Sequence, residues 1–152
     1  MNIIFSDQPQ IIVGKSLFLA GPTTRAKDVE SWRTNAVNIL KYLKYDGTVL
    51  VPERADWQAL NSYEEQIEWE YSGLLKATNI VFWVPRSDVL PGFTTNVEFG
   101  YWLNKTPEKI VYGRPDDSKQ TRYLDFLYFK ETCQKPFNDL TDMLSIFKDY
   151  VK

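Results

Sequence analysis

The sequence contains no histidine and only one cysteine, Cys133. Without imidazole, Ser–His hydrolysis, histidine acid–base catalysis and the usual zinc sites are excluded. A single cysteine permits neither an internal disulfide nor a multi-cysteine metal cluster, and no histidine is present to activate it as a nucleophile. In an enzyme of this composition, proton transfer and nucleophilic attack therefore fall to Asp, Glu, Tyr or Lys, or to a bound ion.

The chain also lacks a basic surplus and a long apolar run. Its net charge is -2 and its pI is about 5.2, which argues against extensive binding to a nucleic acid duplex. No stretch approaches the ~20 apolar residues that span a bilayer, and the N-terminus lacks the pattern of a signal peptide. We therefore expect no membrane partner and a cytoplasmic location.

What is present is an ordinary globular composition that is rich in aromatic residues. The 152 residues fit a single domain, 1–152, that is long enough to bury a core. Aromatic residues make up 15% of the chain, with five Trp. This fits either an aromatic core or a site that stacks planar ligands.

Short apolar runs that end at glycine or proline predict four buried strands. They lie at residues 16–20, 48–51, 80–84 and 109–112. Apolar residues at helical spacing predict five helices, the first capped by Asp28. These helices lie at residues 28–45, 63–77, 94–105 and 121–132, and from Asp139 or Thr141 to residue 151. Weaker patterns indicate an edge hairpin from residues 3–5 and 11–13, and a short edge strand at residues 135–137.

This alternation of strands and helices predicts an α/β fold. We expect a doubly wound, mostly parallel sheet of four to five strands, in a flavodoxin-like or Rossmann-like three-layer sandwich. Ligands of such sheets bind beyond the carboxyl ends of the strands, where the strand order reverses. For the four main strands in the order 2-1-3-4, that point lies between the strands that end at Ala20 and Val84.

Small and polar residues follow the strand that ends at residue 20. Gly21, Pro22 and Thr23 are candidate substrate-binding residues, because glycine lets the backbone approach a ligand closely. An ordinary strand-to-helix turn has the same composition, so this interpretation stays open.

Charged residues follow the strand at residues 48–51. Glu53, Arg54 and Asp56 are placed to contact a ligand, but a solvated loop is the simpler interpretation. A metal-dependent phosphate-ester enzyme is a third, weaker hypothesis, and it would need Glu53, Asp56 and Asp88 to cluster.

Glu98 is the acid best placed for chemistry. We expect it in the first turn of a helix that begins at Thr94 or Thr95, beyond the carboxyl end of a buried strand. Backbone amides at that position would keep the carboxylate ionised, as a nucleophile toward a sugar anomeric carbon requires. Thr95 and Glu98 also match a capping box, which would give Glu98 a purely structural role.

The helix predicted at residues 63–77 is rich in acid, most of which the helix dipole explains. We expect its buried face to consist of Ile67, Tyr71, Leu74 and Leu75. Glu70 falls on a neighbouring stripe of the same helix.

Three segments carry a resemblance to a known family. They are FLAGPT (residues 18–23), IEWEYSGLLKATNIVFWVP (residues 67–85) and PGFTTNVEFGYW (residues 91–102). They resemble the nucleoside 2-deoxyribosyltransferase family, specifically its shorter, transferase-like branch, with similar spacing over residues 16–113. The VEFGY run is the most specific piece, because members place their nucleophilic glutamate in a Glu-x-Gly-Tyr turn.

The resemblance implies roles for several residues. Glu98 would attack C1′ of a deoxyribonucleoside to form a deoxyribosyl-enzyme ester, which a second base or water then resolves. Glu70 aligns with the family's aspartate that handles the base and its proton, so that Glu replaces Asp. The family's sugar-holding aspartate is replaced by Gly92. Candidates to take over its contact are Asp88, Thr94, Thr95 and Asn96.

Aromatic residues complete the set of candidate binding residues. Trp69, Trp83 and Phe93 could stack a nucleobase, although a structural role fits both Trp residues equally well. The family completes its site with groups from a neighbouring subunit, so the resemblance implies a homo-oligomer, dimer or higher. We expect neither a cofactor nor a metal.

Two main hypotheses follow. The first is an enzyme, an N-glycosyltransferase or a nucleoside or nucleotide N-glycosidase, whose partners are a small-molecule nucleoside or nucleotide and a free base. The alternative is a nucleotide-binding or sensing domain with the same cleft and no turnover.

Overall fold

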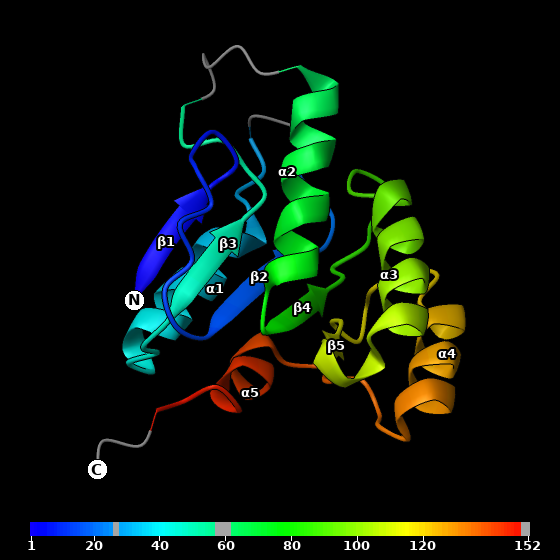
Figure 1. The fold of residues 1–152 in the computed structure, drawn as a ribbon. Helices are drawn as coiled ribbons and strands as arrows, with labels where there is room; N and C mark the ends of the chain where they lie inside the picture. The colour runs from blue at the N-terminus through cyan, green and yellow to red at the C-terminus, as the bar shows by residue number, and fades with distance from the viewer. Residues whose placement is uncertain (26–27, 57–61, 150–152) are drawn as a thin grey trace.

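The computed structural model describes residues 1–25, 28–56 and 62–149 (Figure 1). Within them, one parallel sheet lies between two helical layers, which confirms the predicted α/β class. The strands are β1 (Asn2–Phe5), β2 (Ser16–Ala20), β3 (Thr48–Val51), β4 (Asn79–Trp83) and β5 (Ile110–Gly113). The helices are α1 (Trp32–Tyr42), α2 (Tyr63–Lys76), α3 (Phe93–Lys105), α4 (Arg122–Thr132) and α5 (Leu140–Ser145), with a 3-10 turn, η1 (Pro107–Lys109), before β5.

The sheet has the order β1-β3-β2-β4-β5, and all of its pairs are parallel. The four predicted strands are β3, β2, β4 and β5 in this order, which is the expected 2-1-3-4 arrangement. In register, Phe18 of β2 lies between Leu50 of β3 and Ile80 of β4. The strand order therefore reverses between β2 and β4, as predicted.

The expected hairpin at the N-terminus is wrong. β1 is a parallel edge strand beside β3, and residues 11–13 form no strand. A parallel edge strand must be followed by a return along the sheet, and residues 6–15 make that return along α2. Gln10 donates to the Trp69 backbone carbonyl, and the Trp69 indole donates to the carbonyl of Gln8 at 2.9 Å. The edge strand expected at residues 135–137 is reduced to a single bridge between Gly113 and Phe137.

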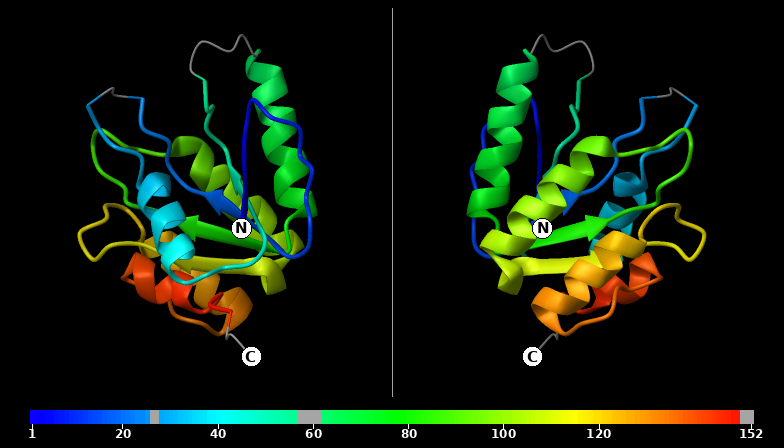
Figure 2. Two further views of the ribbon diagram at one scale, coloured as in Figure 1. Left: turned by 90° about the vertical axis from the view of Figure 1, so that its left-hand side faces the viewer. Right: turned by 90° about the vertical axis from the view of Figure 1, so that its right-hand side faces the viewer.

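The two faces of the sheet are covered by different helices. Phe18 and Ala20 of β2 join a core with side chains of α2, α3 and α4, whereas Leu17 and Leu19 join a core with those of α1 and α5. Successive strand residues point to opposite faces, so each buried strand serves both cores. The right-hand view of Figure 2 has α3 and α4 in front of the sheet and α1 behind it.

Two helix ends differ from the predicted ones. The Ser31 hydroxyl accepts a hydrogen bond from the Arg33 amide at 3.2 Å. Ser31 and not Asp28 therefore caps α1, which begins at Trp32. The Asp139 carboxylate accepts from the Asp142 amide and starts α5, which ends at residue 145. The prediction of helix up to residue 151 is wrong for residues 146–149, and its last residues lie outside the described ones.

The buried face of α2 also differs from the predicted one. Ile67, Tyr71 and Leu75 are exposed, and of the four expected residues only Leu74 is buried. The stripe that contains Glu70 and Gly73 faces inward instead. A Cβ on Gly73 would lie 2.8 Å from the Phe18 ring, so glycine lets this stripe pack directly against β2. None of the described helices is long and apolar enough to cross a membrane.

Candidate active site

A cavity of about 240 Å³ opens at the point where the strand order reverses. The segments that follow β2 and β4 extend beyond the same edge of the sheet (Figure 2). These segments, together with α1, α2 and α3, supply the walls. The lining residues are Phe18, Ala20, Gly21, Pro22, Thr23, Arg25, Arg33, Pro52, Glu70, Val89, Pro91, Gly92, Phe93, Thr94 and Glu98.

Two carboxyl groups meet in this cavity. Glu70 comes from α2 and Glu98 from α3, and the two side chains lie within hydrogen-bonding reach of each other. Both are half-buried. Two acids that share a low-dielectric site cannot both ionise freely, so their titrations are linked.

Glu98 is not in the first turn of its helix, as was expected. α3 begins at Phe93, with Gly92 in the N-cap position and no side-chain cap, so Glu98 is the sixth helical residue. Because Thr95 lies buried inside the helix, the expected capping box is absent. The carboxylate is therefore not stabilised by the free amides of the helix start.

The prediction that Glu98 is ionised at neutral pH is also wrong. Burial and the negative charge of Glu70 raise the pKa of Glu98 to about 8, and the charge of Arg33 only partly opposes them. The charge of Glu70 can act in this way only where Glu70 is ionised first. Of the two acids, Glu98 therefore has the more strongly raised pKa.

The neighbours of Glu70 favour its ionised form and limit the rise of its pKa. Burial raises the pKa of Glu70, while a hydrogen bond from Gln66 and the charge of Arg33 oppose that rise. The Gln66 amide donates to Glu70 from the preceding turn of α2, with 2.8 Å between Nε2 and Oε1. The different partners of Glu70 and Glu98 thus separate the roles of two chemically identical side chains.

Arg33 is a residue of the cavity that the sequence patterns did not single out. Its guanidinium is buried, with 1% of the side chain exposed, and lies 3.7 Å from the Glu53 carboxylate. Glu53 was expected in a solvated loop, but it pairs with Arg33 and accepts a hydrogen bond from the Ser31 hydroxyl at 2.8 Å. Arg33 shares one helical stripe with the buried Ala36 and Leu40. A charged residue on the buried stripe of an amphipathic helix is the signal that would have identified it.

The segment after β2 approaches the neighbouring strand so closely that glycine is required. Gly21 has φ 151, and a Cβ on it would lie 2.1 Å from the Trp83 carbonyl oxygen. The next carbonyl, that of Pro22, accepts a hydrogen bond from the Trp32 indole at 3.0 Å. This turn is therefore a fixed wall of the cavity.

Gly92 stands where the resemblance places the family's sugar-holding aspartate, and its surroundings leave no room for a side chain. Its φ is 60, in the left-handed region, and a Cβ on it would lie 2.7 Å from Cγ of Pro22. A side chain at this position would displace Pro22, so the two loops that face each other across the cavity fit only with glycine at residue 92.

The structure brings some of the predicted binding residues to the cavity. Gly21, Pro22, Thr23, Phe93 and Thr94 line it. Phe93 is 77% exposed, so it is the predicted aromatic residue that reaches the cavity with its ring accessible.

Other predicted residues lie elsewhere. Trp69 packs on Phe18, with ring centroids 6.1 Å apart, and it holds the N-terminal segment. Asp88 has 84% of its side chain exposed and pairs with Lys119 at 2.8 Å. Thr95 is buried.

Asn96 and Trp83 are likewise outside the set of lining residues. Asn96 is exposed and accepts a hydrogen bond from Arg86. Trp83 is buried in the core between the sheet and α1 and α5. Neither side chain is among those that line the cavity.

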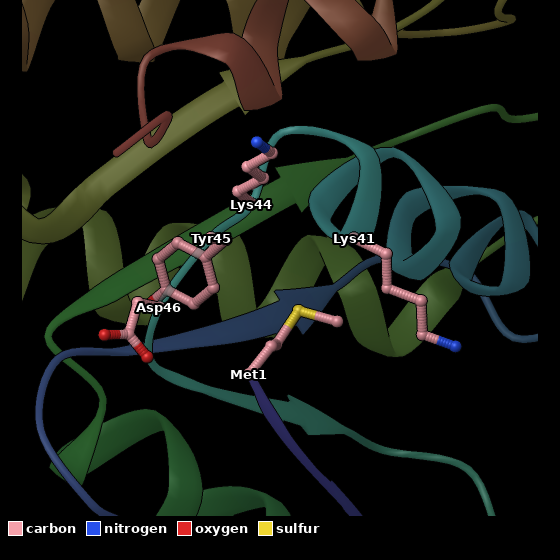
Figure 3. A pocket seen from close by; sticks show the side chains of 5 residues that line it. All are labelled: Met1, Lys41, Lys44, Tyr45 and Asp46. Carbon is pink, nitrogen blue, oxygen red and sulfur yellow. The ribbon is translucent and has the colours of Figure 1, made fainter. Parts of the chain in front are cut away.

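A larger hollow, of about 450 Å³, lies at the opposite end of the sheet, where the strands begin. It is lined by Met1, Lys41, Lys44, Tyr45 and Asp46. The ammonium groups of the two lysines point in different directions (Figure 3). Its described lining residues include one carboxylate, that of Asp46, and no pair of acids, so the smaller cavity is the candidate active site.

The residues that the structure describes contain no group of three His, Cys, Asp or Glu side chains that could hold a metal ion. Glu53, Asp56 and Asp88 therefore do not form the acid cluster that the metal-dependent hypothesis requires. The cavity instead contains two acids, a buried guanidinium and the backbone of the turn after β2.

Comparison with known proteins identifies one family. Residues 14–116, which include Arg33, Glu70 and Glu98, match the family model described as "Nucleoside 2-deoxyribosyltransferase like". Among solved structures, a conserved protein from Enterococcus faecalis V583 is similar, with a TM-score of 0.48 and 14% sequence identity over 90% of this chain and 89% of that chain. No match was found among curated proteins.

Proposed function

The chain belongs to the nucleoside 2-deoxyribosyltransferase-like family, and from this premise we propose that it cleaves or transfers the N-glycosidic bond of a (deoxy)nucleoside or nucleotide. The observation that carries the proposal is the pair of glutamates, Glu70 and Glu98, that lie together in the cavity with raised pKa values. A glycosidic bond is broken by one carboxylate that attacks the sugar and one carboxylic acid that protonates the leaving group. A pair with one proton supplies both.

The first half-reaction needs that proton to change places. On substrate binding it moves from Glu98 to Glu70, and the Glu98 carboxylate attacks C1′ as the bond from C1′ to the base nitrogen breaks. Glu70 gives its proton to that nitrogen, so the base leaves in neutral form. The products are a glycosyl ester on Glu98, an ionised Glu70 and a free base, and all protons are accounted for.

The second half-reaction regenerates the pair. An incoming base or a water molecule loses a proton to Glu70 and attacks C1′, which releases Glu98 as a carboxylate. Attack by a base completes a transfer, and attack by water completes a hydrolysis. The exposed ring of Phe93 and the apolar residues Val89 and Pro91 offer a stacking surface for the base.

Product analysis tests this function. The protein is incubated with a deoxynucleoside and a second free base, and the products are separated by chromatography. We expect a new nucleoside or free deoxyribose, and a mass increase of one deoxyribosyl group on the peptide that contains Glu98. Glu98→Ala and Glu98→Gln should abolish both, whereas Glu68→Gln on the exposed face of α2 should not change them.

Two results would contradict the proposal. Undiminished turnover by a folded Glu98→Ala protein would remove Glu98 from the mechanism. A rise in Tm with nucleosides or nucleotides, without any product, would favour the alternative of a binding or sensing domain, because a ligand that binds only the folded state stabilises it by mass action.

We further propose that the partner in solution is a second copy of this chain. Tyr71 and Leu75 of α2 and Tyr101 of α3 are about half-exposed, and the rings of Tyr71 and Tyr101 lie 6.3 Å apart. Exposed apolar surface of this kind is typical of an interface. Light scattering on the eluting protein measures the mass directly, and a monomer at micromolar concentration would contradict this proposal.

A further inference from the structure

The described residues include two buried cations, Arg33 and Arg86, of which only Arg33 lines the cavity. Burying a charge costs a large amount of free energy unless it is paired and hydrogen-bonded. The hydrogen-bond and ion-pair partners of Arg33 should therefore explain why a cation is buried beside the cavity.

The guanidinium of Arg33 first fixes the turn after β2. Its Nε donates to the Leu19 carbonyl at 2.8 Å, and its Nη2 donates to the Gly21 carbonyl at 2.7 Å. Its Nη1 donates to the Thr23 hydroxyl at 3.0 Å. Because the guanidinium is planar and its donors have fixed directions, three bonds to one turn determine the position of that turn.

The same guanidinium lies among acids from three other elements. Glu53 follows β3, Glu70 belongs to α2 and Glu98 belongs to α3, and the charge of Arg33 interacts with all three. Among the described residues that line the cavity, one further side chain is ionisable, that of Arg25, which is exposed. Arg33 thus connects the wall of the cavity with its acidic centre.

We infer that Arg33 is a positioning residue of the active site, which places the wall formed by Gly21, Pro22 and Thr23 and sets the electrostatic environment of the Glu70–Glu98 pair. This inference rests on the proposed function. Glu53 pairs with Arg33 at 3.7 Å, and Glu70 and Glu98 add two more carboxyl groups, so three acids surround one buried guanidinium. A net negative site favours a sugar that develops positive charge in the transition state.

The test separates the charge of Arg33 from its shape. Arg33→Met is made in a Glu53→Gln background, so that the Glu53 carboxylate is not left buried without its ion-pair partner, and Glu53→Gln alone is the matched control. The carboxyl proton of Glu98 is followed over pH by infrared difference spectroscopy against Glu98→Gln, a measurement that needs no turnover. We expect the titration in Arg33→Met/Glu53→Gln to move upward by about one pH unit relative to Glu53→Gln.

Activity provides the second readout. In the same double variant, both limbs of the pH profile of kcat/KM should move to higher pH. Arg33→Lys retains the charge but not the fork, so its limbs should stay in place while KM rises by about tenfold or more, as expected for a displaced wall. If Arg33→Lys has the KM and kcat of the wild type, the argument from the shape of the guanidinium is overturned. This result can be obtained even if the double variant does not fold.

The outcomes distinguish the inference from the proposed function. A titration of Glu98 that does not move in the double variant, with only Tm lowered, would make Arg33 a structural residue and overturn the inference. If the titration moves as expected but the parent protein never turns over a nucleoside, the proposed function fails, and the link between Arg33 and the acid pair stands.

Discussion

Gln66 donates a hydrogen bond from Nε2 to Oε1 of Glu70, 2.8 Å away and one turn further along α2. The bond stabilises the ionised form of Glu70, and so it favours Glu98 as the carrier of the shared proton. Because the two residues belong to one helix, this arrangement does not depend on the ligand.

Gln66→Met should therefore raise the pKa of Glu70. The acid limb of the pH profile of kcat/KM reports protonation of the remaining carboxylate, so it should move to higher pH by about one unit or less, as the loss of one hydrogen bond predicts. The basic limb should stay nearly in place. Glu68→Gln, a substitution on the exposed face of the same helix, is the control. An unchanged acid limb in Gln66→Met would remove Gln66 from the control of the pair.

The basic limb of the wild-type profile makes a second prediction. In the proposed mechanism the active form carries one proton on the glutamate pair, and burial and the charge of Glu70 raise the pKa of Glu98 to about 8. Loss of that proton leaves no acid for the departing base, so kcat/KM should fall tenfold per pH unit above about pH 8. Steady-state rates between pH 5 and 10 measure this. A rate that rises through pH 8 and then levels off would mean that Glu98 acts alone.

The raised pKa of Glu98 also has a consequence for stability. The pKa is raised from 4.5 to about 8 on folding, so in this window the folded protein binds more protons than the unfolded chain. The free energy of unfolding therefore decreases as pH rises from about 4.5 to 8, and is unaffected by this group at higher pH. Glu98→Gln does not titrate and should avoid that loss.

Glu98→Gln should accordingly be more stable than wild type at pH 8.5, on the order of 2 kcal/mol, and nearly equal to it at pH 4.5. Urea titrations of both proteins at the two pH values measure the difference. Equal stability of the two proteins at pH 8.5 would show that Glu98 ionises without cost in the folded state.

Two glycines at different points of α3 provide a fourth prediction. Gly92→Ala places a methyl group 2.7 Å from Pro22 in a left-handed conformation, and should cost about 1–3 kcal/mol of stability together with part of the activity. Gly100→Ala meets no atom within 4 Å in the helix interior, and should add about 0.5–1 kcal/mol. Thermal unfolding and turnover of both variants test this. A stable, fully active Gly92→Ala protein would contradict the close fit of the two loops.

The arrangement of the sheet could be predicted from the sequence because each buried strand ends at glycine or proline. The helix faces could not be predicted so well. The exposed Ile67 and Leu75 were expected to be buried, because hydrophobicity alone does not reveal that Gly73 brings its own stripe against Phe18. The pattern of apolar residues predicts the helix at residues 63–77, but the lack of a side chain at Gly73 determines which side of that helix packs on the sheet.

The candidate site was predictable in position but not in its electrostatics. Glu70 and Glu98 were expected to act, and they line one cavity. The charge state of Glu98 was expected to follow from a helix start, yet α3 begins earlier, at Phe93, and the carboxyl group lies beside Glu70 instead. Arg33 was overlooked because a charge in a helix is normally assumed to face solvent. Pair geometry of this kind depends on contacts between residues far apart in the chain.

The return segment from β1 to β2 has a practical consequence. Gln8 and Gln10 bond to Trp69, the residue directly before Glu70, and Gln10 also accepts from Ser72 at 2.9 Å. Residues 8–10 therefore help to hold in place the helix that carries Glu70. An affinity tag or a cleavage next to residue 1 can disturb this contact. The activity of such a protein should therefore be compared with that of the untagged, uncleaved protein before a loss of activity is attributed to a point substitution.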